Sequence, residues 1–224
     1  MIGRRGRFIT VGSLGFGYIY ARIHAEPTPA FLYAGLQESL LDAVVFSWVM
    51  IAAYYTSGFL GRVLYGAQMR IMDGTLARAN CLLITTLWSI ARFLVVPLGM
   101  RLAVLFPPET YAAVFAFVWL SYMAGDTASE VIGSLFGRQK LRVWGIGEVN
   151  RKSVAGTWAC FVASLALCAG IAAAQGLPAP WFGLALAIAV SNTLLELFSP
   201  RGTDDVTMVA ASGLICWAFG AFVL

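Results

Sequence analysis

Charged residues are scarce in this chain, and this scarcity limits the classes of protein to which the chain can belong. Only 12% of the 224 residues are charged, whereas soluble domains carry about 25%. An ordinary soluble domain is therefore excluded. Strands that alternate polar and apolar residues are also absent, which argues against an outer-membrane barrel. What is present is apolar: 60% of the residues are hydrophobic and the mean hydropathy is +0.80. The composition predicts an all-α integral membrane protein with helices of roughly 20 residues.

Cysteine motifs and internal repeats are missing as well. The four cysteines show no Cys-x-x-Cys spacing, so we expect buried thiols that pack as small hydrophobes. No segment of the chain convincingly repeats another. No small-residue cleavage site follows the first apolar stretch, and a removed signal peptide is therefore not expected.

Seven apolar segments are predicted to be transmembrane helices. Six are long: Leu40–Gly61, Cys81–Met100, Tyr111–Glu130, Val154–Gln175, Ala179–Leu197 and Val206–Leu224. The seventh, Phe8–Tyr20, is short and glycine-rich, and a tilted span and an interfacial segment both remain open for it. Residues 1–224 are treated as one membrane domain, with scaffold helices in 1–110 and the chemical motifs in 111–224.

Basic residues gather on one side of the membrane in this seven-span arrangement. With the N-terminus in the cytoplasm, twelve of the fifteen lysines and arginines lie on the cytoplasmic side, as the positive-inside rule requires. They are Arg4, Arg5, Arg7, Arg62, Arg70, Arg78, Arg138, Lys140, Arg142, Arg151, Lys152 and Arg201. The net charge of +4 is thus assigned mainly to helix orientation, and no nucleic-acid partner is expected. The single histidine, His24, falls in an external loop, so a histidine-based cytoplasmic site is not expected.

Two clusters of carboxylates lie at the ends of apolar segments. Asp126 and Glu130 are four residues apart, which places them one turn apart on one helix face. The second cluster contains Glu196, Asp204 and Asp205. Ionised groups near a bilayer are costly and usually mark an ion or substrate site. Carboxylate oxygens are also the ligands that Mg²⁺ prefers, together with substrate phosphates.

Both clusters are predicted to open on the cytoplasmic side. The loops Val131–Ser153 and Phe198–Asp205 are separated by an even number of crossings, so they share one membrane surface. Nucleotides are available there. Acidic residues beside a glycine-broken basic stretch, at a surface that nucleotides reach, favour phosphoryl chemistry on a membrane substrate.

Five short motifs occur in a recognisable order between Ala124 and Thr207. They are Gly125-Asp126-Thr127-Ala128, Gly133-x-x-x-Gly137-Arg138-x-Lys140, Lys152-Ser153-x-x-Gly156-Thr157, Glu196 and Gly202-Thr203-Asp204-Asp205. In this order they resemble the polyprenol kinase family. That family includes dolichol, phytol and farnesol kinases and CTP-dependent diacylglycerol kinase, and is distantly related to CDP-diacylglycerol synthase.

The resemblance implies a reaction and a set of roles. It implies CTP as phosphate donor, a lipid alcohol as acceptor, and Mg²⁺ or a similar cation. Asp126, Asp204 and Asp205 are then expected to hold the metal, and Glu130 or Glu196 to take the proton of the alcohol. The residues expected to bind the nucleotide phosphates are Gly137, Arg138, Lys140, Lys152, Ser153, Gly156 and Thr157.

The chain departs from the family pattern at two places. Val206 stands where the family commonly has Asn, and the segment at Arg78 lacks the Lys and His of an upstream element. The stretch from Asp126 to Glu130 also resembles a related family that includes phytyl-phosphate kinases, so a monophosphate acceptor stays open. The alternatives are a CDP-lipid cytidylyltransferase, a transporter or channel, and an inactive family member. Gly133 and Gly137 also fit a helix-packing GxxxG pair.

Overall fold

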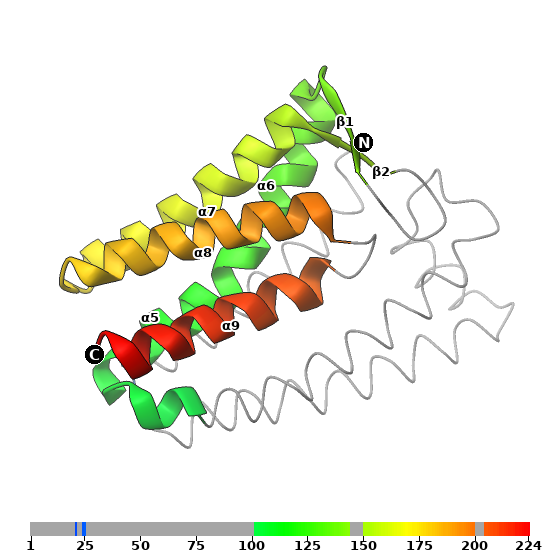
Figure 1. Ribbon diagram of the computed structural model, residues 1–224. Coiled ribbons are helices and arrows are strands. Elements are labelled where there is room, and N and C mark those ends of the chain that lie inside the picture. The colour runs from blue at the N-terminus through cyan, green and yellow to red at the C-terminus, as the bar shows by residue number, and fades with distance from the viewer. Residues whose placement is uncertain (1–20, 22–23, 26–100, 144–149, 200–203) are drawn as a thin grey trace, which may run out of the picture.

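The computed structural model describes residues 21, 24–25, 101–143, 150–199 and 204–224, and these are mostly helical (Figure 1). Three predicted spans, Phe8–Tyr20, Leu40–Gly61 and Cys81–Met100, lie outside the described residues. The segment at Arg78 and the pair Gly202-Thr203 also lie outside them.

The third long apolar segment forms one continuous helical run. It begins with the 3-10 turn η2 (Pro108–Thr110) and continues through α5 (Tyr111–Phe115), the π-helical stretch η3 (Ala116–Leu120) and α6 (Ser121–Phe136). The sequence predicts the start at Tyr111 but places the end at Glu130. The helix continues to Phe136 and stops at Gly137, where the backbone leaves the helical region (φ −73°, ψ 70°).

A small β-hairpin replaces most of the predicted loop between residues 131 and 153. Its strands are β1 (Lys140–Val143) and β2 (Asn150–Ser153), which pair antiparallel. The expected all-α class therefore needs this one addition. In Figure 1 the hairpin lies at the end of the bundle opposite the C-terminus.

The last three helices follow the predicted spans closely. They are α7 (Val154–Ala174), α8 (Pro180–Phe198) and α9 (Asp204–Phe222). The boundaries of α7 and α8 have local causes. The Ser153 hydroxyl accepts the Gly156 N–H (3.1 Å) and caps α7, and Pro180 opens α8, where a missing N–H costs nothing. Both helices are long and apolar enough to span a membrane.

Close approach of α6 and α7 depends on small residues. A Cβ built on Gly156 would lie 2.8 Å from the Ser129 carbonyl oxygen, and one on Gly133 would lie 3.4 Å from the Gly156 Cα. A side chain at Gly156 would therefore require a shift of the α6 backbone, and one at Gly133 would press on the Ser153 hydroxyl 2.9 Å away. Small residues that let helix backbones approach are typical of membrane helix pairs. The packing interpretation of Gly133 thus has direct structural support.

The bundle is closed by aromatic side chains at the end away from the hairpin. Trp181, at the start of α8, lies 5.7 Å from Phe106, 5.7 Å from Phe117 and 5.4 Å from Phe219, measured between ring centroids. All four side chains are at most 8% exposed. The described helices therefore have an aromatic, tightly packed end and, at the opposite end, the hairpin.

Candidate functional site

A buried ion pair joins two of the predicted motifs at the hairpin end of the bundle. The Lys152 ammonium donates to Oε1 of Glu196 across 2.6 Å. The Ser129 hydroxyl donates to the same oxygen across 2.7 Å. Glu196 is 3% exposed and Lys152 is 14% exposed. Three segments up to 67 residues apart in sequence, from α6, β2 and α8, thus converge on one carboxylate oxygen.

The second oxygen of Glu196 has no hydrogen-bond partner among the described residues, although it is buried. Buried polar atoms are almost always paired, and an exception calls for a specific reason such as a catalytic role or a bound ion or water. A buried carboxylate also needs its cation, because removing one partner of such a pair leaves an uncompensated charge. One oxygen of Glu196 is therefore held by two donors, and the other is buried without a described partner.

A second polar layer lies deeper in the bundle, and the sequence analysis missed it. Asn192 donates to the Ser121 hydroxyl (3.1 Å) and accepts from the Ser212 hydroxyl (3.0 Å). The Ser164 hydroxyl donates to the Ser121 carbonyl (3.0 Å). These four side chains have 0% exposure and come from α6, α7, α8 and α9. The only sequence signal was that Asn192 precedes Glu196 by one helical turn.

Asp126 and Glu130 both lie in α6, one turn apart, as predicted. Both are half-buried, and each takes part in an interaction within the molecule. The Cys160 thiol of α7 lies within electrostatic reach of both Asp126 and Glu196. One member of each predicted acidic cluster, Asp126 and Glu196, therefore approaches the same part of α7.

The predicted phosphate-binding residues form a group of small residues, described first, and a group of basic residues. Ser153, Gly156 and Thr157 form the start of α7, where the Thr157 hydroxyl also donates to the Ser153 carbonyl (3.1 Å). A side chain at Gly137 would collide with the Gly133 carbonyl and with Ser153, so close packing explains this glycine.

The basic members of that set differ in what they contact. Arg138 is exposed; its backbone N–H donates to the Phe136 carbonyl (2.8 Å), but its guanidinium makes no hydrogen bond or ion pair with any described residue. Lys140 is exposed and donates to the Gly133 carbonyl at 3.4 Å, near the C-terminal end of α6. Cations are favoured at that end of a helix. Lys152, by contrast, forms the ion pair with Glu196. Arg138 is therefore the member best placed to meet a ligand from solution.

Asp204 and Asp205 are the first two residues of α9. Acidic residues are favoured at helix N-termini, which accounts for their position without a ligand. A hydrogen bond of 2.7 Å between the hydroxyls of Ser199 and Thr207 holds the first turn of α9 beside the end of α8. The start of α9 thus lies at the end of the bundle where α8 finishes (Figure 1).

The donor set of the predicted metal site suits Mg²⁺ in chemistry. Its members Asp126, Asp204 and Asp205 offer only carboxylate oxygens, which hard divalent cations prefer. Among the described side chains, no three of His, Cys, Asp or Glu come together. The residue types of the predicted site thus suit the metal, while the metal site itself stays a prediction.

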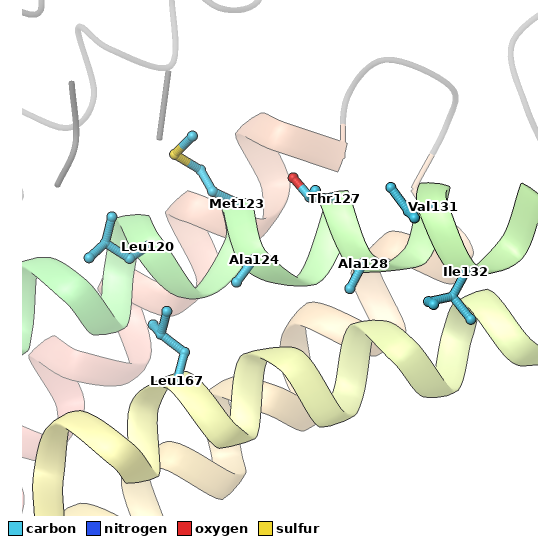
Figure 2. A pocket seen from close by; sticks show the side chains of 8 residues that line it. All are labelled: Leu120, Met123, Ala124, Thr127, Ala128, Val131, Ile132 and Leu167. Carbon is cyan, nitrogen blue, oxygen red and sulfur yellow. The ribbon is translucent and has the colours of Figure 1, made fainter. Parts of the chain in front are cut away.

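An apolar groove of about 540 Å³ runs along α6 (Figure 2). Apart from Thr127, its lining is entirely apolar: Leu120, Met123, Ala124, Ala128, Val131, Ile132 and, from α7, Leu167. In Figure 2, Met123, Thr127 and Val131 lie on the side of α6 away from α7. The groove therefore sets an apolar surface next to the acidic turn of the same helix.

The fold and the site define a helical bundle with helices fit for a membrane and a buried Lys–Glu–Ser cluster at one end. No family model matches this chain, and neither a curated protein nor a solved structure matches it. The site must therefore be interpreted from its own chemistry.

Proposed function

We propose that this chain is a multi-pass membrane phosphotransferase that moves a phosphate from CTP, or another nucleoside triphosphate, to a lipid alcohol. The acceptor is an isoprenoid alcohol such as phytol, farnesol or dolichol, or diacylglycerol. The N-terminus and the active site lie on the cytoplasmic side of about seven spans. The observation that carries the proposal is the contact of Lys152 with Glu196, because it joins two separate motifs of the resemblance in one buried cluster.

The arrangement at the hairpin end suits a reaction between a charged donor and an apolar acceptor. Exposed Arg138 can meet a nucleotide from the aqueous side. The apolar groove along α6 suits an isoprenoid chain. Asp126 lies next to that groove in sequence and on the same helix. Charge and apolar surface thus adjoin on one element, as a lipid kinase requires.

In this reaction the oxygen of the alcohol attacks the γ-phosphorus, the bond to the β-phosphate oxygen breaks, and the nucleoside diphosphate leaves. Phosphoryl transfer depends mainly on positioning and charge neutralisation. Asp126, Asp204 and Asp205 would hold Mg²⁺, which supplies neutralisation of the phosphate charge when bound.

A carboxylate would accept the proton of the alcohol. Glu196 offers a buried oxygen with no partner among the described residues, whereas Glu130 is half-buried one turn from Asp126. Substitution of each by Gln separates the two. The true proton acceptor is the one whose loss lowers kcat strongly with little change in the KM of either substrate.

The decisive experiment uses purified full-length protein in detergent, labelled CTP, Mg²⁺ and a panel of phytol, farnesol, dolichol and diacylglycerol. Transfer of the γ-phosphate to one lipid, with release of CDP, is the expected result. Release of pyrophosphate would instead identify a cytidylyltransferase. No nucleotide consumption with any acceptor, with solute flux in sealed vesicles, would identify a transporter. The aromatic layer around Trp181 argues against that outcome, since it closes the described bundle at one end.

A further inference from the structure

Ser129 is a buried member of the Lys152–Glu196 cluster to which the sequence motifs assign no role. It lies in α6, is 6% exposed, and donates its hydroxyl to Oε1 of Glu196 across 2.7 Å. The residue belongs neither to the predicted metal site nor to the predicted phosphate-binding set. Its contact with a carboxylate 67 residues away in sequence ties α6 to α8 at the level of the ion pair.

The backbone around Ser129 leaves its hydroxyl little freedom. A Cβ built on Gly156 would lie 2.8 Å from the Ser129 carbonyl oxygen, so α6 and α7 already approach closely at this residue. A serine hydroxyl is carried by one side-chain torsion, which has only a few staggered positions. The packing of the two helices therefore holds the Ser129 Oγ in place.

Lys152 alone would not fix the orientation of the Glu196 carboxylate. An ammonium has several donors on a long flexible stem and can bond to either oxygen of a carboxylate. In the structure Ser129 and Lys152 both donate to Oε1, and Oε2 is buried without a partner among the described residues. The short hydroxyl on a fixed backbone thus decides which oxygen is bonded and which is left without a bond.

We infer that Ser129 is a positioning residue that keeps Oε2 of Glu196 oriented to accept the proton of the lipid alcohol. The inference rests on the proposed function and selects Glu196 over Glu130 as the proton acceptor. The proton of the alcohol moves to Oε2 while the alcohol oxygen bonds to the γ-phosphorus. The bond from that phosphorus to the bridging oxygen breaks, and the nucleoside diphosphate leaves. A base that is already oriented accepts the proton without first turning toward it.

Steady-state kinetics of the purified full-length protein, with labelled CTP and the lipid of the panel that it phosphorylates, test the inference. Ser129→Ala should lower kcat about tenfold, the loss expected for one hydrogen bond, with the KM for CTP and for lipid unchanged within about twofold. Ser164→Ala is the matched control, because the Ser164 hydroxyl is also buried and donates to α6, at the Ser121 carbonyl (3.0 Å). This variant should lower Tm by a similar amount and leave kcat unchanged.

Infrared spectra give a second measurement that does not depend on turnover. The carboxyl band of Glu196 is the band that Glu196→Gln removes; it should shift in Ser129→Ala and stay in place in Ser164→Ala. The inference is overturned if Ser129→Ala keeps kcat, raises the KM for CTP instead, or leaves the band unmoved. It is also overturned if Glu196→Gln keeps the wild-type kcat, since Glu130 would then be the base. These results all require an active wild type. The proposed function itself fails, and the inference with it, if the wild-type protein transfers phosphate to none of the acceptors.

Discussion

At the scale of single residues, the main result is that Lys152 and Glu196 form one unit. The sequence assigned them separate roles, one at the phosphates and one at the acceptor. Their contact spans 44 residues of sequence, and no local spacing encodes such a pairing. The acidic pair Asp126 and Glu130 was predictable, because its spacing fixes one helix face. Asn192 was not, since a single amide in an apolar run has no periodic signal.

The ion pair makes a prediction about stability. Lys152→Met should destabilise the protein by about 3 kcal/mol, because it leaves a buried charge unpaired. Lys152→Met/Glu196→Gln should recover a large part of that loss, because neither charge then remains. Unfolding by denaturant in mixed micelles measures both variants, with Arg142→Met as the exposed control. A double variant less stable than Lys152→Met would contradict the pairing.

Asp126 makes a prediction about activity. Asp126→Asn keeps the size of the side chain but removes its charge, so it should abolish phosphorylation while the protein still inserts and expresses. Phosphate transfer from labelled CTP, compared at equal amounts of purified protein, measures the effect. Turnover at the wild-type rate would remove Asp126 from the proposed metal site.

Substitution of two arginines that are near each other in sequence can distinguish a residue that binds the nucleotide from one that only contributes positive charge. Arg138 belongs to the predicted phosphate-binding set and Arg142 does not, yet both are exposed. Arg138→Gln should raise the KM for CTP roughly tenfold, the value of a single charged contact of about 1.4 kcal/mol, while Arg142→Gln leaves it unchanged. Steady-state kinetics with CTP and lipid varied in turn decide the point. Equal small effects would mean that these charges only set topology.

At the scale of elements, the sequence predicts the described helices well and the two strands not at all. The boundaries of α7 and α8 agree with the predicted spans within one residue, because long apolar runs meet clear start signals at Ser153 and Pro180. The strands have four residues each, and all four in β2 are polar or charged. Such a segment lacks the alternating apolar residues that would identify a strand.

The crossing of α6 and α7 makes a prediction with an internal control. Gly156→Ala should destabilise the protein by about 1–3 kcal/mol, because the new methyl group would press on the Ser129 carbonyl. Gly170→Ala, in the same helix, should be neutral or slightly stabilising, since nothing lies within 4 Å of its Cβ position. Thermal unfolding of the two variants side by side measures the difference. Equal effects would show that the two helices do not approach closely there.

At the scale of the whole molecule, the two ends of the described bundle differ in their side chains. Aromatic side chains around Trp181 fill one end, a fully satisfied polar layer around Asn192 lies inside, and the Lys152–Glu196 pair lies at the hairpin end. A polar interior that meets an aromatic layer suits a site entered from one side. For this reason we propose an enzyme at a membrane surface in preference to a transport path.

The orientation of the chain in the membrane predicts which residues are accessible from each side. Single cysteines placed at Ala179, in the turn between α7 and α8, should react with an impermeant thiol reagent in whole cells. Those at Gln139 or Thr203 should stay protected until the membrane is opened, because the positive-inside rule places both on the cytoplasmic side. The native thiols Cys160, Cys168 and Cys216 are buried, and the fourth, Cys81, which lies outside the described residues, is replaced by Ser to keep the background low. If Gln139 and Thr203 labelled from opposite sides, the two acidic clusters could not share one surface, and a common phosphotransfer site would be ruled out whatever the activity of the protein.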